Sequence, residues 1–358
     1  MKVSEAEMRV EKIQHYLNEN KIDAMLIESP INRRYVTGFT GTFGSVFITQ
    51  QKAIFITDFR YVAQAKDQAK GFTVIENRNT AEEIGQQIEK EQIRTLAFEE
   101  AYTSFTNYKK LQAYENVELV PVIDVIEQMR MIKSAEEIER MKTAASISDK
   151  AFERILNDLQ VGVSEKDICN KLEMYMREEG ATSSSFDMII ASGYRSALPH
   201  GVASNKKIEQ NDVVTLDFGA LYEGYCSDMT RTVVVGTPPE QLEEIYHIVN
   251  DALTIGIESV KAGASCGVVD TAIRDFITEK GYGEQFGHGA GHSFGLEIHE
   301  SPYFAKTSTD ILKENMVMTI EPGIYIPNLG GVRIEDDVIV TATGCEIITK
   351  SPKELIRL

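Results

Sequence analysis

Two acidic side chains stand at the ends of apolar runs that flank a short turn segment. One run ends on Asp217, a second follows Asp228, and the glycine-containing segment 219–224 between them is typical of a turn. Opposed residues of an antiparallel hairpin have a constant sum of residue numbers, so this pair predicts a hairpin centred between Tyr222 and Glu223. Both carboxylates would then face each other on one side of the sheet, roughly 5 Å apart at Cβ.

The same arrangement recurs nearer the C-terminus. Glu321 and Glu335 flank a turn segment centred on Asn328, and the strand-like stretches 316–320 and 332–340 adjoin them. A single acidic residue near a turn is usually solvated or caps a helix, but the repeat of paired carboxylates is harder to explain in that way. Four carboxylates brought together repel one another strongly unless cations neutralise them. The two pairs therefore predict a cation site.

Histidines are few in this chain, and three of the six fall in one glycine-rich stretch, as His288, His292 and His299. A fourth, His200, lies in a segment predicted to be a loop. The neighbouring glycines let the backbone approach a ligand closely. Oxygen-rich sites with one imidazole suit paired Mn²⁺, Co²⁺ or Zn²⁺ ions, and two such ions activate water for hydrolysis. The acidic pairs and the histidines together predict a hydrolytic metal site.

The chain from about Ser134 onward resembles the metal-dependent peptidases of the prolidase, aminopeptidase P and methionine aminopeptidase group, which have the pita-bread fold. The N-terminal third resembles the extra domain of prolidases and aminopeptidase P. All five ligand positions of the group carry the expected residue types in order, which is more specific than any single motif. The matching stretches are Thr-Leu-Asp-Phe-Gly at 215–219, Tyr-Cys-Ser-Asp-Met-Thr-Arg-Thr at 225–232, 288–300, Thr-Ile-Glu-Pro-Gly at 319–323, and Gly-Val-Arg-Ile-Glu-Asp at 331–336.

The resemblance implies a role for each predicted ligand. Asp228 and Glu335 would bridge two divalent cations, for which Mn²⁺ is the first expectation and Co²⁺ and Zn²⁺ are the alternatives. Asp217 would complete one site, and His292 and Glu321 the other. Glu321 would also act as the general base.

The remaining predicted site residues would contact the substrate. His200, His288 and His299 match family positions that bind substrate or stabilise an oxyanion, although each could equally be structural. Arg333 stands two residues before Glu335, on the same face of a predicted strand. It would orient a ligand carboxylate, contact substrate, or form an ordinary ion pair.

The substrate expectation follows from the N-terminal domain, which most methionine aminopeptidases lack. It points to cleavage of Xaa-Pro bonds in proline-containing dipeptides or short peptides, and we favour a Xaa-Pro dipeptidase. Some prolidases carry an arginine four positions after the second substrate histidine, where this chain has Tyr303, so a Xaa-Pro aminopeptidase acting on longer peptides is the alternative. Relatives that act as non-catalytic binding modules, and creatinase, which needs no metal, are further alternatives. Family resemblance also implies a homodimer.

Composition indicates which classes of partner and which cellular compartment to expect. The formal net charge is −18, from 37 basic and 55 acidic residues, which argues against nucleic acid and anionic membranes as partners. Four cysteines form no CxxC pair and predict reduced thiols in a cytoplasmic protein. The charged N-terminal stretch is unlike a signal peptide, and no apolar run is long enough to cross a bilayer.

Hydrophobic patterning predicts two domains and an α+β fold class. Residues 1–125 would form a smaller α/β domain. Residues 126–358 would form an antiparallel sheet covered by helices, which the family resemblance identifies as a pita-bread domain. In the second domain, helices begin after Ser134, Ser164 and Pro239, and a fourth covers 270–280. The first domain has predicted strands at 23–28, 45–49, 53–57, 72–75, 95–98 and 117–120, and predicted helices at 5–20, 60–70, 81–91 and 104–114.

Overall fold

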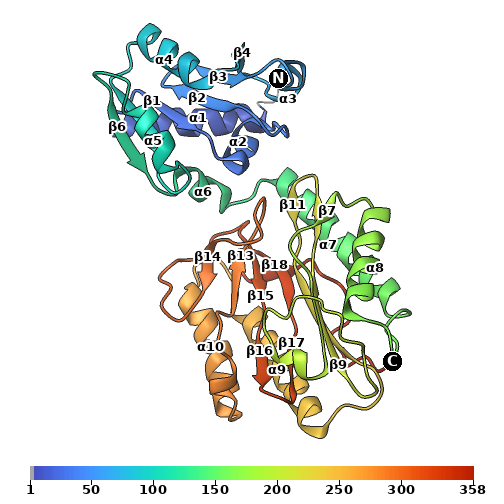
Figure 1. The fold of residues 1–358 in the computed structure, drawn as a ribbon. Helices are drawn as coiled ribbons and strands as arrows, with labels where there is room; N and C mark the ends of the chain where they lie inside the picture. Colours follow the sequence, from blue (N-terminus) through green and yellow to red (C-terminus); the bar gives the residue numbers. More distant parts are fainter. Residues whose placement is uncertain (1–3) are drawn as a thin grey trace. The chain divides into compact units, whose positions relative to one another are not determined.

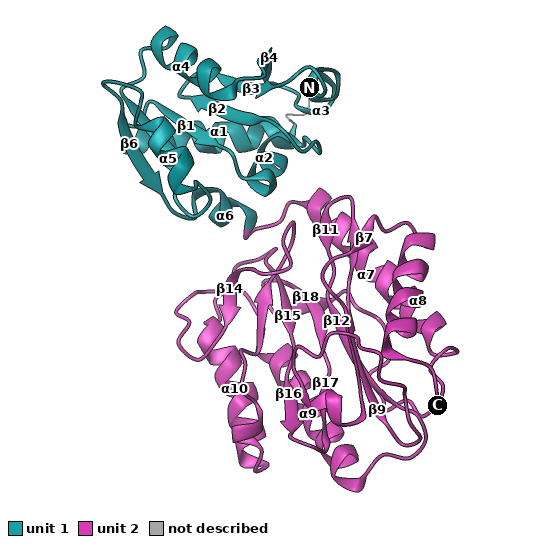
Figure 2. Ribbon diagram, viewed as in Figure 1, with its two compact units in different colours: residues 1–130 teal, residues 131–358 magenta. Residues whose placement is uncertain are grey.

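The computed structural model describes residues 4–358 and divides into two compact units, residues 1–130 and 131–358 (Figure 2). The boundary predicted between residues 125 and 126 falls at the start of α6 (Val125–Arg130). Two hydrogen bonds attach this helix to the first unit. Tyr35 Oη donates to the Met129 carbonyl at 3.0 Å, and Arg130 Nη1 donates to Asn32 Oδ1 at 2.9 Å.

The first unit is built on a six-stranded mixed sheet in the order β4-β3-β2-β1-β5-β6 (Figure 1). Every residue of β1 and β2 is buried, as expected for central strands covered on both faces. Each predicted strand and helix of this unit is present, with ends that differ by a few residues. The strands are β1 (Ala24–Ile27), β2 (Ser45–Thr49), β3 (Ala53–Thr57), β4 (Thr73–Glu76), β5 (Thr95–Glu99) and β6 (Glu118–Val122), and the predicted helices are α1 (Glu5–Asn20), α3 (Val62–Gln68), α4 (Thr80–Lys90) and α5 (Phe105–Leu111).

Two helices of the first unit, α6 and α2 (Pro30–Thr37), were not predicted, and α2 shows why. Ser29 caps it and Pro30 occupies its first turn, which are ordinary helix-start signals. The helix nevertheless buries polar side chains, among them Arg33, which donates to the Gly41 and Gly44 carbonyls at 3.1 and 2.7 Å. A helix that buries polar groups has no apolar stripe, so hydrophobic periodicity does not reveal it.

The second unit places four long helices against antiparallel strands (Figure 1). The first two helices begin after Ser134 and Ser164, as predicted, and both serines form capping boxes, whereas α10 begins at Cys266, earlier than expected. No helix within residues 4–358 is both long and apolar enough to span a membrane. The helices are α7 (Ala135–Ile155), α8 (Glu165–Glu178), α9 (Glu240–Ser259) and α10 (Cys266–Glu279).

The strands of the second unit form a three-stranded sheet, β12-β9-β8, a five-stranded sheet, β14-β13-β15-β18-β19, and smaller ladders β11-β10-β7 and β16-β17. Both larger sheets are antiparallel throughout. The strands are β7 (Ser183–Ser184), β8 (Ile189–Ser192), β9 (Val213–Phe218), β10 (Ala220–Tyr222), β11 (Tyr225–Cys226), β12 (Met229–Val234), β13 (Gly291–Ser293), β14 (Glu300–Phe304), β15 (Val317–Ile320), β16 (Gly323–Ile326), β17 (Gly330–Arg333), β18 (Asp336–Val340) and β19 (Cys345–Ile347).

The register predicted for the first acidic hairpin is wrong by two positions. Asp217 of β9 pairs with Thr230 of β12, not with Asp228. The turn lies at Glu223 and Gly224, which both have positive φ, of 46° and 83°, as a two-residue type I′ turn requires. Because side chains alternate with a period of two, a two-residue shift leaves Asp228 diagonal to Asp217 on the same face.

The register predicted for the second acidic hairpin is confirmed on both sides of the acidic pair. Gly323 pairs with Arg333 and Ile320 with Asp336, so both ladders share a centre at Asn328, whose φ is 66°. The single strand predicted over 332–340 is instead divided into β17 and β18. The Glu335 N–H, at this break, donates to the Thr230 carbonyl at 3.1 Å and so joins the two larger sheets.

A buried ion pair ties the two larger sheets together close to this junction. Arg231 of β12 is 1% exposed and donates from Nη2 to Asp336 Oδ1 at 2.8 Å. Its Nη2 and Nε also donate to the Ser351 and Pro352 carbonyls. Lys353 contacts the other oxygen of Asp336 at 2.6 Å. Buried charges of this kind are tolerated because every polar atom has a partner.

Replacing Arg231 by methionine should lower the free energy of unfolding of the whole protein by about 3 kcal/mol or more, because Asp336 loses its buried guanidinium partner. Urea unfolding followed by circular dichroism measures the change. Arg177→Met, which removes an exposed pair with Glu173 in α8, is the matched control and should cost less than about 1 kcal/mol. Equal losses in both variants would contradict the role assigned to Arg231.

Candidate metal centre

One cavity of the second unit brings together every site residue predicted from the sequence. Its volume is about 370 Å³. The predicted residues that line it are His200, Asp217, Asp228, His288, His292, His299, Glu321, Arg333 and Glu335. The other lining residues are Phe186, Asp187, Ile189, Pro199, Val202, Gly289, Gly291, Ile298 and Tyr303.

The acidic residues reach the cavity from separate strands and strand ends. Asp217 lies in β9, and Asp228 directly precedes β12. Glu321 directly follows β15, and Glu335 fills the break between β17 and β18. Strand ends aim these side chains inward while the backbone keeps its ladder hydrogen bonds on either side.

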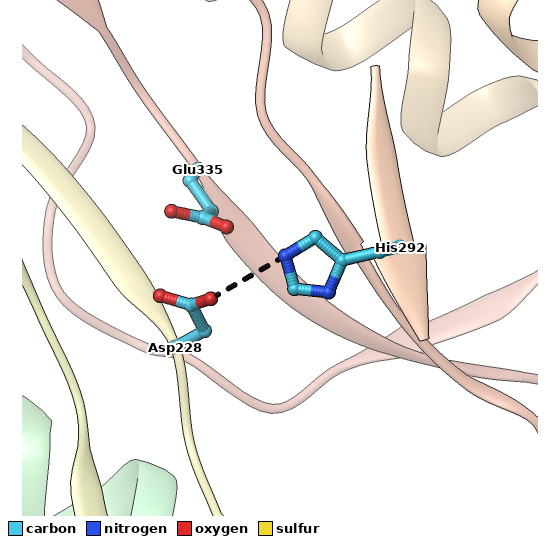
Figure 3. A group of neighbouring side chains, drawn as sticks. All are labelled: Asp228, His292 and Glu335. Carbon is cyan, nitrogen blue, oxygen red and sulfur yellow. Dashed lines mark ion pairs between the residues drawn. The ribbon is translucent and has the colours of Figure 1, made fainter. Parts of the chain in front are cut away.

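Three of the predicted ligands form a compact group. One possible ligand atom from each of Asp228, His292 and Glu335 lies within 4.8 Å of the others, and Figure 3 shows the three side chains pointing toward one another. His292 Nε2 is 3.7 Å from Asp228 Oδ2 and 3.6 Å from Glu321 Oε1. These separations are too long for hydrogen bonds, but they suit atoms that share a cation through bonds of about 2.0–2.2 Å.

His292 is held in the tautomer that a metal ligand needs. Its Nδ1 lies 3.0 Å from the Ser293 carbonyl, to which it donates, so the Nε2 lone pair faces the carboxylates. Burial lowers the pKa of His292 to about 4 despite that hydrogen bond. The imidazole is therefore neutral near pH 7 and can bind a cation.

The carboxylates are destabilised in their ionised form. Burial raises the pKa of Asp228 well above its usual range, and the charges of Glu335 and Asp217 raise it further. Burial and the charges of Glu321 and Asp217 do the same to the pKa of Glu335. Burial raises the pKa of Glu321 to about 7, against the opposing charge of Arg333.

These features together test whether the residues fit a divalent cation. Asp228 Oδ1 is buried and has no hydrogen-bond partner within residues 4–358. A buried carboxylate oxygen needs a partner, and a cation is the only kind that would also relieve the repulsion among its neighbours. Hard oxygen ligands with one imidazole suit Mn²⁺, Co²⁺ or Zn²⁺. The donor set therefore fits the predicted metals.

Residues behind the predicted ligands hold them in place, and sequence reasoning missed these. Thr230 Oγ1 donates to Glu335 Oε2 at 2.6 Å. Asp337 Oδ2 accepts from the Asp228 N–H at 3.0 Å, and Thr319 Oγ1 accepts from the His292 N–H at 3.0 Å. Thr230, Asp337 and Thr319 each stand two positions from a predicted ligand, which is the spacing of neighbours on one strand face.

Arg333 acts on a predicted ligand. Its Nη2 donates to Asp217 Oδ2 at 2.6 Å. Arg333 therefore orients this carboxylate, which is the first of the three roles considered for it from the sequence. Its Nη1 donates to Tyr325 Oη at 2.8 Å and to the Pro199 carbonyl at 3.2 Å, and Nε donates to Thr230 Oγ1. Burial alone would lower the pKa of Arg333, but Tyr325 and Asp217 raise it above its ordinary value, so the guanidinium stays charged.

His288 is engaged by the protein at both ring nitrogens. Its Nδ1 lies 2.8 Å from the Gly289 carbonyl, and its Nε2 lies 2.8 Å from Tyr325 Oη. Burial, with the nearby charge of Arg333, lowers its pKa to about 4. Arg274 of α10 fixes this segment by donating to the His288 carbonyl at 2.8 Å. His288 therefore has no free ring N–H to offer a substrate in this arrangement.

The other two predicted histidines are less constrained. His299 packs its ring against His292, with centroids 4.6 Å apart, and His200 is exposed in a loop at the cavity wall. Tyr303, which is 45% exposed, also lines the cavity. An imidazole in such a place can donate a hydrogen bond to a developing oxyanion.

Two family models match the chain. The model of the Creatinase/Prolidase N-terminal domain matches residues 9–132, and that of Metallopeptidase family M24 matches residues 139–342. The Uncharacterized peptidase YqhT of Bacillus subtilis (strain 168) is 51% identical over 98% of this chain and 100% of its own length. These matches confirm the family resemblance and the metallopeptidase prediction.

Solved structures agree with the family models. The Xaa-Pro dipeptidase from Bacillus anthracis superposes with a TM-score of 0.97 at 50% identity, over 99% of this chain and 100% of that one. The X-Pro aminopeptidase from Thermotoga maritima MSB8 superposes with a TM-score of 0.90 at 40% identity, over 94% of this chain and 98% of that one. The predicted fold class, a pita-bread domain preceded by a smaller α/β domain, is confirmed.

Asp228→Ala and Glu335→Ala should each abolish retention of divalent cations and lower turnover by at least about 10²-fold, while the fold stays largely intact. Metal per chain is measured by plasma mass spectrometry after reconstitution and desalting, and folding by circular dichroism. Asp251→Ala, an exposed change on α9, is the control and should keep its metal. A variant at either site that binds as much metal as wild type would refute the assignment.

Metal-free protein should lose stability as the pH rises from about 4.5 to about 7, because the pKa of Glu321 is raised on folding and the folded state binds the proton more tightly. Removing this carboxylate in Glu321→Gln should therefore stabilise the metal-free protein near pH 8, on the order of 1 kcal/mol. The difference in stability between Glu321→Gln and wild type should vanish near pH 5. Thermal unfolding in chelator across this range measures it, and a difference that does not change with pH would count against the pKa shift.

Proposed function

This chain belongs to metallopeptidase family M24, and we propose that it hydrolyses Xaa-Pro bonds in short peptides, using two divalent cations. The observation that carries the proposal is the group of Asp228, His292 and Glu335, buried beside Glu321 in a cavity of peptide size. Asp228 and Glu335 would bridge the cations, with Asp217 completing one site and His292 and Glu321 the other. The names of relatives that act on Xaa-Pro substrates support the substrate class.

The protein's own groups supply the proton transfers. When bound, the divalent cations would activate water and polarise the peptide carbonyl. Glu321, whose pKa burial raises to about 7, is suited to accept the proton of the attacking water and pass it to the leaving nitrogen. His200 and His299 line the same cavity and would donate to the oxyanion. Arg333 keeps Asp217 in position.

The walls of the cavity suit a proline ring. Phe186, Ile189, Pro199, Val202 and Ile298 supply apolar surface around the acidic floor. Proline also leaves as a secondary amine from an imide bond, so the scissile nitrogen carries no N–H that the site must bind. An apolar wall beside a hydrolytic floor therefore accommodates a residue after the scissile bond that offers shape in place of hydrogen bonds.

The metal, the assembly and the compartment belong to the same proposal. Four carboxylates and one imidazole make Mn²⁺ our first choice, with Co²⁺ and Zn²⁺ as alternatives. We expect a homodimer from the family. All four cysteines are free, which agrees with a cytoplasmic location.

Dipeptidase activity is the first candidate, because the solved structure at 50% identity carries that name. One observation favours an aminopeptidase acting on longer peptides. Arg333 is the only lysine or arginine among the described residues that line the cavity, and it is already paired with Asp217. The carboxylate of a dipeptide would find no free guanidinium or ammonium there, since Tyr303 stands where some prolidases have arginine. The carboxylate of a tripeptide would lie about 3.5 Å further out.

Hydrolysis of Ala-Pro, Gly-Pro and Ala-Pro-Ala, each with Mn²⁺, Co²⁺ and Zn²⁺, tests the proposal. The protein should cleave Xaa-Pro dipeptides in the presence of a divalent cation and lose this activity in chelator. Ala-Ala and Ala-Ala-Ala are the controls for the proline requirement. Cleavage of the tripeptide with a higher kcat/KM than the dipeptides would move the assignment to an aminopeptidase. No cleavage of any proline peptide, with no retained metal, would overturn the proposal in favour of a binding module.

A further inference from the structure

A single buried carboxylate outside the cavity accepts hydrogen bonds from the loop that carries His200 and from the residues at its two ends. Glu165 is the first residue of α8 and is fully buried. Its Oε1 accepts from the Ser192 N–H at 2.8 Å and from Ser192 Oγ at 2.9 Å. Its Oε2 accepts from the Ser204 N–H at 3.0 Å, from Ser204 Oγ at 2.6 Å, and from the guanidinium of Arg195. Both oxygens are thus fully used.

The donors to Glu165 come from the two ends and the interior of one loop. Ser192 is the last residue of β8, Ser204 lies beyond the loop 193–203, and Arg195 lies within it in the short 3₁₀ helix η1 (Gly193–Ala197). The second guanidinium nitrogen of Arg195 donates to the Val202 carbonyl at 2.8 Å. Glu165 therefore holds both ends of this loop and, through Arg195, its far side.

The loop has little apolar packing of its own to define its shape. Its large apolar side chains are only partly covered, with Tyr194 60%, Leu198 51% and Val202 52% exposed. Backbone without a packed apolar anchor is held mainly by its hydrogen bonds. A buried carboxylate that accepts several charge-assisted or neutral hydrogen bonds is a strong anchor for such a segment.

The same loop supplies one wall of the cavity. Pro199, His200 and Val202 line it. A second attachment links the loop to the β16-β17 hairpin. Arg333 Nη1 donates to the Pro199 carbonyl at 3.2 Å, and the Gly331 N–H donates to Ser196 Oγ at 2.9 Å. The wall is therefore attached to Glu165 at its base and to the β16-β17 hairpin, and Val202 also forms an antiparallel bridge with Ile189 of β8.

We propose that Glu165 is a positioning residue for the reaction, which sets the place of His200 and of the apolar wall at Pro199 and Val202 without touching the substrate. The activity readout rests on the proposed function, but the placement of the loop does not. Without the charge on residue 165, the guanidinium of Arg195 and the two serines lose their common acceptor, and the wall becomes mobile while the carboxylate floor is unchanged.

Glu165→Gln in the full-length, metal-reconstituted protein tests the proposal, with Glu178→Gln as the matched control. Glu178 lies on the same helix and makes an exposed ion pair with Arg154. Hydrogen–deuterium exchange followed by mass spectrometry should show faster exchange of residues 193–204 in Glu165→Gln, by about tenfold or more, and no change in the control. Metal per chain should equal that of wild type in both.

A double-mutant cycle with His200→Ala separates positioning from general loss of stability. Glu165→Gln should lower kcat/KM for Ala-Pro about 10- to 100-fold in the wild-type background. In the His200→Ala background the loss should be clearly smaller, about 2- to 5-fold, because only the apolar wall is then left to be displaced. If Glu165→Gln folds poorly, Ser204→Ala, which removes one donor to the same carboxylate, should shift exchange and kcat/KM in the same direction by a smaller factor.

The outcomes distinguish this proposal from the proposed function. Unchanged exchange of residues 193–204, or losses in kcat/KM that multiply in full in the double mutant, would overturn the positioning role and leave the peptidase assignment standing. If wild type cleaves no proline peptide, the peptidase assignment fails, and the exchange experiment still decides whether Glu165 holds the loop.

Discussion

Repulsion among buried carboxylates is the constraint on which the second unit depends. Asp228 and Glu335 are 5% and 2% exposed, and the charges of neighbouring acidic side chains raise the pKa of both. A fold that gathers such charges without a counterion gives up stability near neutral pH. The charge of Arg333 lowers the pKa of Glu321 and Glu335 and so offsets part of this repulsion, but does not remove it. The divalent cations that the family implies would supply the missing counter-charge.

The surrounding architecture keeps this costly cluster in one geometry. The two larger sheets meet where the Glu335 N–H donates to the Thr230 carbonyl, and the ion pair of Arg231 with Asp336 locks the same junction. Outer helices hold the loops that complete the cavity. Arg274 of α10 binds the segment of His288, and Glu165 of α8 binds the loop of His200. Strands thus place the floor of the cavity and helices place its walls.

Local sequence was sufficient for the strand pattern and for the residues at the cavity floor. Asn328 can adopt positive φ at little cost, so the second acidic hairpin was centred correctly. The first was misplaced because Glu223, a residue that rarely has positive φ, shares the turn with Gly224. The sheet face of Asp228 was still predicted correctly, because the register error was two residues and side chains alternate with a period of two.

Residues that act through distant partners escaped prediction. Glu165, Asp337 and Tyr325 look like ordinary surface or strand residues until folding supplies Ser204, Asp228 and Arg333.

We propose that the paired carboxylates hold two cations between them. Crystals grown with Mn²⁺ and measured near the manganese absorption edge test it most directly, because anomalous scattering locates the ions without reference to activity. Two anomalous peaks should appear, both within about 2.0–2.4 Å of oxygens of Asp228 and Glu335. A map with no peak between these two side chains at full Mn²⁺ loading would contradict the claim.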